Sequence, residues 1–142
     1  VRTHLKPAPA TALDALQVRS AILNIVRNAM DAMPSGGTLD ISLHSRGDWI
    51  ELAFKDTGCG IPRAAHARLF TPFFTTKPTG AGLGMFIVQR IMHALGGSVR
   101  VQSDEGRGAE VVLDLPVRSH AQPRSLPSPF ELDEHEEDHS HH

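Results

Sequence analysis

The chain has 142 residues, of which 40% are hydrophobic and 21% are charged, and its formal net charge is −2. This length suits one globular domain and leaves little room for a second. No stretch approaches the ~18 uninterrupted apolar residues of a membrane-spanning helix, and the amino terminus lacks a signal-peptide pattern. No Lys or Arg stripe supports nucleic-acid binding. Cys59 is the only cysteine, so an internal disulfide is excluded and an apolar core must stabilise the fold. We therefore expect a soluble, cytoplasmic domain without direct membrane contact and without a nucleic-acid partner.

Charge is distributed unevenly along the chain and suggests a domain boundary. Residues 1–117 carry twelve Lys and Arg against ten Asp and Glu, whereas residues 118–142 carry two against six. The second segment has few large apolar residues, so it cannot bury enough surface to offset the entropy cost of ordering. We expect a folded domain over 1–117 and a disordered, acidic, Pro- and His-containing tail over 118–142. Its histidines could collect a metal ion, although a solvated charge run is the simpler interpretation.

The first half of the folded domain predicts a helix and then a hairpin. From Leu13 to Met33, apolar residues recur every three or four positions, as one face of a long helix requires, and the Pro- and Gly-containing stretch 34–37 ends it. The runs 39–43 and 50–54 then alternate apolar with polar residues. They predict an antiparallel hairpin.

The second half repeats this order after a long segment rich in Gly and Pro. Helical spacing returns from Leu83 to Leu95, and the runs 99–101 and 111–115 predict a second hairpin around a Gly-Arg-Gly turn. Residues 1–5 suggest one further strand. The order predicts an α/β fold, a two-layer sandwich with the helices packed on one face of a mixed or mostly antiparallel sheet.

Two glycine-containing stretches border the irregular segment, where we expect the chemistry. Residues 56–62, Asp-Thr-Gly-Cys-Gly-Ile-Pro, directly follow a predicted strand. A carboxylate there can accept a hydrogen bond from an amine, while the glycines let the backbone pass close to a ligand. Residues 80–84, Gly-Ala-Gly-Leu-Gly, open a predicted helix, whose unpaired N–H groups and dipole suit a phosphate. Either stretch alone is equally typical of a tight bend, and the two together are more specific.

Three polar residues of the first helix add a third element. Asn24, Asn28 and Asp31 are spaced by four and three positions, which places them on one stripe beside the apolar face. Oxygen ligands suit Mg²⁺, which commonly completes its coordination with water and substrate phosphates. A solvated helix face, or amides bonded to neighbouring backbone, is the alternative interpretation.

Taken together, these motifs resemble those of the sensor histidine kinases. Residues 24–32 resemble the family's N box, 56–62 its G1 box, 69–77 its F box and 80–85 its G2 box, and residues 103–109 with Leu115-Pro116 are similar to its last Gly-rich turn and final strand. The resemblance covers about 1–117. The Pro-Phe-Phe-Thr-Thr-Lys core of the F box points to the nitrogen- and oxygen-sensing branch.

The resemblance implies the Bergerat ATP-binding fold, shared with gyrase, heat-shock chaperone ATPases and mismatch-repair ATPases, and it implies ATP and Mg²⁺ as cofactors. Asp56 would hold the adenine amino group, Asn28 would bind Mg²⁺, and residues 63–81 would form the ATP lid. The lid would contain the phenylalanines Phe70, Phe73 and Phe74. They could cover the nucleotide, dock against a partner domain or join the core. The full implied ATP-binding set is Asn28, Asp31, Asp56, Gly58, Gly60, Ile61, Phe70, Thr76, Lys77, Gly80, Gly82, Leu83, Gly84 and Met85.

The resemblance also implies a mechanism, with Asn24, Asn28 and Lys77 as the catalytic residues. ATP-hydrolysing relatives carry a glutamate four positions before the metal-binding Asn, but Asn24 is an amide and cannot act as a general base. This favours transfer of the γ-phosphoryl group to a side chain over hydrolysis. Lys77 is the best lid residue to neutralise phosphate charge. Ala81 and Ala109 stand where residues with a hydroxyl group are usual in the family. Each hydroxyl hydrogen bond that is missing would weaken nucleotide binding by about 1 kcal/mol.

The implied partners are a histidine-bearing dimerisation domain, which this chain lacks, and a downstream response regulator. Dimerisation in the family resides mainly in the missing helices, so the fragment is expected to be monomeric. Two alternatives remain: a stand-alone serine kinase of the anti-sigma-factor type, disfavoured by Asn24 and the F box, and a non-catalytic nucleotide-binding module.

Overall fold

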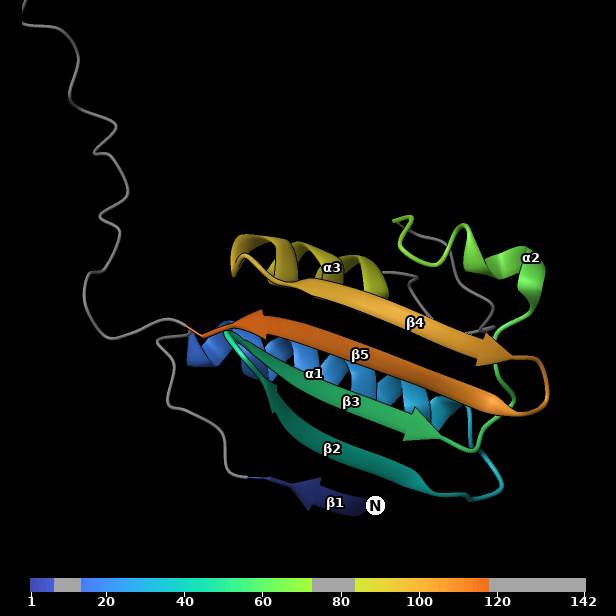
Figure 1. Ribbon diagram of the computed structural model, residues 1–142. Coiled ribbons are helices and arrows are strands. Elements are labelled where there is room, and N and C mark those ends of the chain that lie inside the picture. The colour runs from blue at the N-terminus through green and yellow to red at the C-terminus, as the bar shows by residue number, and fades with distance from the viewer. Residues whose placement is uncertain (7–13, 73–83, 118–142) are drawn as a thin grey trace, which may run out of the picture.

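The computed structural model describes residues 1–6, 14–72 and 84–117. Within them, a five-stranded sheet forms one layer, in the order β1-β2-β3-β5-β4 (Figure 1). The strands are β1 (Arg2–Leu5), β2 (Leu39–Arg46), β3 (Trp49–Asp56), β4 (Ser98–Asp104) and β5 (Gly108–Pro116). β1 pairs in parallel with β2, and the other neighbours pair antiparallel. The mixed sheet, the two hairpins and the additional amino-terminal strand are therefore confirmed.

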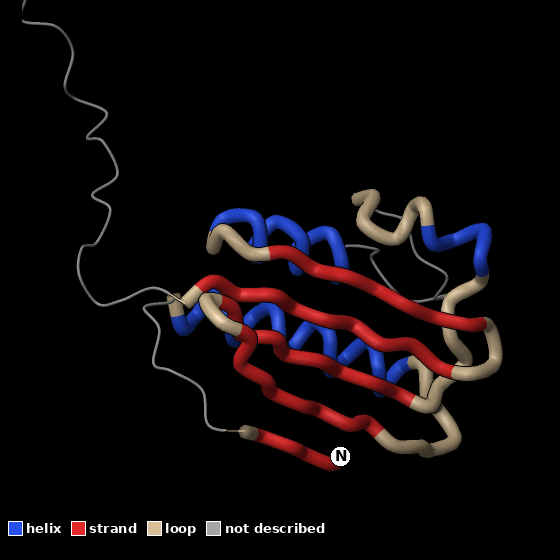
Figure 2. Tube along the Cα trace, in the orientation of Figure 1, coloured by secondary structure: helices blue, strands red, loops and turns tan. Residues whose placement is uncertain are grey.

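The second layer consists of helices α1 (Ala15–Asp31) and α3 (Gly84–Ala94), which cover one face of the sheet (Figure 2). The core lies between the layers. Ile25 of α1 is 1% exposed, Val88 of α3 is 0% exposed, and both belong to one buried cluster with Phe54 and Leu113 of the sheet. Burial of such side chains from both layers supplies the main stabilising term. The predicted two-layer α/β sandwich is thus confirmed.

The ends of α1 differ slightly from the sequence prediction, and capping explains the difference. The Asp14 side chain accepts hydrogen bonds from the backbone N–H groups of Leu16 and Gln17, at 3.1 and 3.2 Å, so the helix begins at Ala15 rather than Leu13. At the other end the helix stops at Asp31, and tighter turns follow, with Met33 N–H donating to the Met30 carbonyl.

One short helix was not predicted. α2 (Arg63–His66) directly follows Pro62, which occupies its N-cap position. Four residues are too few to display a 3.6-residue hydrophobic period, so periodicity gives no signal there. α2 lies within the segment expected to form the lid.

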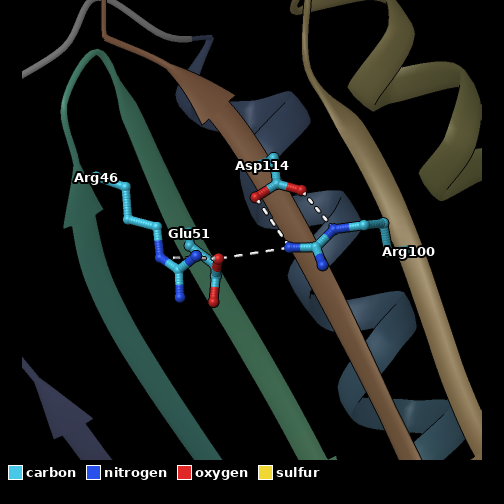
Figure 3. Close-up of polar contacts among 4 residues, drawn as sticks. All are labelled: Arg46, Glu51, Arg100 and Asp114. Carbon is cyan, nitrogen blue, oxygen red and sulfur yellow. Dashed lines mark hydrogen bonds and ion pairs between the residues drawn. The ribbon is translucent and has the colours of Figure 1, made fainter.

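The face of the sheet opposite the helices carries a network of charges (Figure 3). Arg100 of β4 donates from Nε to Asp114 Oδ2 of β5 at 2.9 Å, and its Nη2 lies 3.4 Å from Glu51 Oε2 of β3. Arg46 of β2 approaches the same Glu51 oxygen at 3.5 Å. The hydrogen bond and charge of Asp114 raise the pKa of Arg100 above its ordinary value. The network therefore connects four neighbouring strands on their polar face.

The predicted tail, residues 118–142, lies outside the described residues, so the proposed boundary at 117 remains a prediction. None of the helices in the described ranges has the length and apolar character needed to cross a membrane.

Candidate functional site

Asp56, the last residue of β3, is the only buried charged side chain among the described residues, with 8% exposure. Its Oδ1 atom accepts two backbone hydrogen bonds, from Gly58 N–H at 2.9 Å and from Ala109 N–H at 3.2 Å. Two N–H donors on one oxygen fix the orientation of the carboxylate. Asp56 is the last residue of β3, so its second oxygen could accept a hydrogen bond from an amine of a ligand at that end of the sheet.

The loop after Asp56 is held on one side by the carboxyl end of α1. Cys59 N–H donates to the Ala32 carbonyl at 3.1 Å. A β-carbon at Gly58 would lie 2.5 Å from that same carbonyl oxygen, so a larger residue there would push the loop away from α1. The glycine at this position permits the close approach on which the site depends.

The β4–β5 turn holds the loop on its other side. Gly106 N–H donates to the Cys59 carbonyl at 2.7 Å. Ser103 Oγ accepts from Ile61 N–H at 2.7 Å and donates to the Gly108 carbonyl at 2.9 Å. Gly60 has φ +71°, and a β-carbon there would lie 2.2 Å from the Asp104 carbonyl oxygen. The residues from Asp56 to Ile61 are therefore clamped between two distant parts of the chain.

Asn28 and Gly84, predicted from two different motifs, are brought together by the fold. α1 and α3 pack against each other, and a β-carbon at Gly84 would lie 3.2 Å from Asn28 Nδ2 and 3.4 Å from Asn28 Oδ1. The half-buried Asn28 amide thus lies beside the first residue of α3. A helix start presents N–H groups to anions, so an amide oxygen that could hold a cation lies beside a helix start that could bind a phosphate.

The other two polar residues of the α1 stripe are placed differently. Asn24 Nδ2 donates to the Ser20 carbonyl, one turn earlier in the same helix, at 2.8 Å. This is the backbone bonding considered as an alternative for the amides, and it fixes the orientation of the side chain. Asp31 is exposed at the last residue of α1. The roles predicted for both residues remain predictions.

Three apolar residues of the predicted set are buried or half-buried. Phe70 is half-buried and packs against the core cluster together with Leu69, which agrees with the core interpretation of that phenylalanine. The Met85 side chain is 9% exposed and belongs to the core itself. Ile61 is half-buried in the clamped loop.

Several predicted residues lie outside the described part of the chain. They are Phe73, Phe74, Thr76, Lys77, Gly80, Ala81, Gly82 and Leu83. Their predicted contacts with phosphate or with a partner domain therefore stay predictions.

Ser103 and the backbone N–H of Ala109 were not predicted as site groups. Both belong to a motif that the sequence displays, the Gly-rich turn at 103–109, but a backbone donor has no side-chain signature. Ser103 is a small polar residue in a half-buried strand, and its contacts to Ile61 and Gly108 depend on how the turn folds over the loop.

Comparison with known proteins places this geometry in a family. Residues 13–119 match the model of the histidine kinase-, DNA gyrase B- and HSP90-like ATPases. The chain is 35% identical to sporulation kinase E of Bacillus subtilis over 109 residues, which cover 76% of this chain and 15% of that protein. Among solved structures, it resembles the mycobacterial sensor histidine kinase MprB, with TM-score 0.72, 29% identity and 82% coverage of both chains. It also resembles full-length ShkA in complex with AMPPNP, with TM-score 0.74 and 30% identity over 85% of this chain and 26% of that one.

The chain therefore belongs to the histidine kinase-, DNA gyrase B- and HSP90-like ATPase family. The resemblance to the ATP-binding catalytic domain of sensor histidine kinases, first drawn from the boxes, is confirmed. The chain spans about a seventh of the length of sporulation kinase E, since it covers 15% of that protein.

Proposed function

We propose that this chain is the ATP-binding catalytic part of a two-component sensor kinase, which transfers the γ-phosphoryl group of ATP to a histidine on a separate dimerisation domain. The observation that carries the proposal is Asp56: a buried carboxylate with one oxygen fixed by two backbone N–H groups. Adenine presents an amino group where guanine presents a carbonyl, so an acceptor at this position selects adenine. The similarity to ShkA, whose structure contains AMPPNP, supports a nucleotide ligand.

A magnesium ion fits the polar groups on the α1 side of the site. The Asn28 amide lies beside the start of α3, where nucleotide phosphates would approach. An amide oxygen is a suitable ligand for a hard cation, and Mg²⁺ normally takes further ligands from phosphates and water. Bound there, the ion would neutralise charge on the transferring phosphoryl group. Asn28 is accordingly the proposed metal ligand.

Asn24 supports phosphotransfer over hydrolysis. The Asn24 amide is fixed by its bond to the Ser20 carbonyl, and a neutral amide cannot remove a proton from water. The domain would position ATP and leave nucleophilic attack to the incoming histidine, with Lys77 neutralising phosphate charge.

The proposed partners follow from the proposed reaction. They are a histidine-bearing dimerisation domain and a downstream response regulator, and the reaction takes place in the cytoplasm, where ATP is available. The relatives include sensor kinases such as ZraS and AtoS of Escherichia coli K12. We propose that this fragment itself is monomeric, and that its F box is of the nitrogen- and oxygen-sensing type.

Phosphotransfer to an added acceptor tests the proposal. The full chain is mixed with a separately produced histidine-bearing dimerisation domain, labelled ATP and Mg²⁺, and the product is separated by electrophoresis. We expect acid-labile, base-stable label on the acceptor, as phosphohistidine requires. An acceptor with its histidine changed to glutamine is the matched control and should stay unlabelled.

Other results would point elsewhere. Acid-stable label would indicate a serine kinase. Nucleotide binding without label on any acceptor would indicate a regulatory module, and rapid release of inorganic phosphate without acceptor would contradict the role given to Asn24.

A further inference from the structure

The outer side of α1 carries large apolar side chains, although it faces away from the core. Leu16, Leu23 and Met30 are 77%, 52% and 63% exposed. They are spaced by seven residues, so they form one nearly axial line along the helix. The core face of the same helix, with Ile25 at 1% exposure, lies opposite. α1 is therefore apolar on two sides, and only one is covered by the sheet.

Two arginines complete this line, and we name the five residues Leu16, Arg19, Leu23, Arg27 and Met30 the outer stripe. Both arginines are exposed, and neither makes an ion pair with another residue in the ranges 1–6, 14–72 and 84–117. The stripe thus alternates apolar and positively charged side chains. An occupant that matches it must present apolar side chains flanked by acidic ones.

A second copy of α1 does not meet this requirement. Asp31, at the very end, is the only acidic residue within α1. Pairing two stripes, in either direction, would place arginines near arginines with no carboxylate between them along most of the contact. Like charges across an interface disfavour association.

The chain itself contains a segment of the required chemistry beyond the described residues. Residues 126–138 read Leu-Pro-Ser-Pro-Phe-Glu-Leu-Asp-Glu-His-Glu-Glu-Asp. Leu126, Phe130 and Leu132 are its large apolar residues, and six of the eight residues from 131 to 138 are acidic. A segment that cannot fold alone can still order on a complementary surface.

Val117, the last described residue, lies at the end of the fold from which residues 126–138 could reach the start of α1. The carboxyl end of α1 lies at the Asp56 end of the sheet, because Cys59 N–H bonds to the Ala32 carbonyl. Pro116 pairs with Trp49, at the opposite end of β3. The chain therefore leaves the fold at the end of the molecule where α1 begins, as Figure 1 shows for β5 and α1.

The lengths agree with this placement. A flexible chain of about thirteen residues, the separation between Val117 and Phe130, has a typical span of about 20 Å. The 17 residues of α1 measure about 25 Å along the axis. Phe130 and Leu132 can thus lie over the stripe, and the tether would supply an effective concentration in the millimolar range.

We propose that residues 126–138 of this chain dock on the outer stripe of α1, with Phe130 and Leu132 against its apolar residues and the acidic run beside Arg19 and Arg27. The surface is distinct from the proposed nucleotide site, because Asn24 and Asn28 lie on another side of α1. Docking would cover the one large apolar line that the fold leaves exposed on this helix.

Photocrosslinking in the full 142-residue chain tests this docking. Phe130 is replaced by benzoylphenylalanine, the protein is irradiated, and the linked peptides are identified by mass spectrometry. We expect links within one chain to peptides from Ala15–Asp31, with a yield unchanged by dilution. The Arg19→Glu/Arg27→Glu variant should lower that yield by about fivefold, and added salt should lower it in the wild type.

Two controls separate docking from general charge effects and from misfolding. Lys55→Glu/Arg63→Glu makes the same change in net charge at exposed positions away from the stripe and should leave the yield unchanged. In the Arg19→Glu/Arg27→Glu background, Glu134→Arg/Glu137→Arg should restore the links. Links to other elements, links only between chains, or a yield indifferent to charge reversal on α1 would each overturn the proposal.

Discussion

Asp56 and Asp114 are carboxylates on neighbouring strands of one sheet, but they differ in burial and in the groups that they contact. Asp114 lies on the polar face and is paired with the Arg100 guanidinium at 2.9 Å. Asp56 is buried, and one of its oxygens accepts hydrogen bonds from the backbone N–H groups of Gly58 and Ala109. A carboxylate paired with a cation near the surface contributes modestly to stability, whereas we propose that the buried Asp56 carboxylate also binds a ligand. The comparison separates a carboxylate that pairs with an arginine across two strands from one that we propose binds the nucleotide.

The largest expected effect comes from removing the charge at Asp56. Asp56→Asn keeps the size of the side chain but replaces an acceptor oxygen with a donor, so the adenine amino group loses its partner. We expect the affinity for ADP to fall by about 10- to 100-fold, the range for a hydrogen bond to a charged group. Titration calorimetry measures the change. Asp114→Asn is the matched control and should bind ADP as the wild type does; equal losses in both variants would refute the comparison.

A smaller effect is expected at the proposed metal ligand. Asn28→Ala removes the amide oxygen beside Gly84, so the gain in ATP-analogue affinity on adding Mg²⁺ should shrink by about tenfold. Titrations with and without Mg²⁺ give this gain directly. Affinity without the metal should change little, and a variant that retains the full gain would exclude Asn28 as a ligand.

Weakening the contacts that hold the Asp56 loop should have a still smaller effect on binding, together with a loss of stability. Ser103→Ala leaves Ile61 N–H and the Gly108 carbonyl without their shared partner, at a cost of about 1 kcal/mol or more in unfolding free energy. We expect ADP affinity to fall by about fivefold. Chemical denaturation and calorimetry check both. Ser98→Ala, at an exposed position of the same strand, should change neither.

The smallest effect is expected on the open face. Arg100→Met removes the bonds to Asp114 and the contact with Glu51, all on exposed or partly exposed side chains. We expect a loss of about 1 kcal/mol or less in stability and unchanged nucleotide affinity. Thermal unfolding at low and high salt measures the loss, which should be smaller at high salt. A large loss of ADP binding would show that the two faces are coupled.

Much of the fold was predictable because its elements display clear periods. The core-facing residues Ile22, Ile25 and Ala29 of α1 have helical spacing, and the hairpins alternate apolar and polar residues around short turns. Asp56 could be predicted as a site residue because a carboxylate follows an apolar strand and precedes two glycines. Helix α2 could not, because four residues carry no period.

The sequence by itself determined the order of the five strands and the two long helices, the family boxes and the acid at the end of β3, because each is encoded in residues near one another in the chain. Only the tertiary structure decided what holds that acid. Ala109 N–H is 53 positions from Asp56, and Ser103 is 42 positions from Ile61. Their meeting depends on strand order and register, in which β5 lies beside β3 and the β4–β5 turn folds over the loop. Register is set by the packing of whole elements, so a local pattern does not contain it.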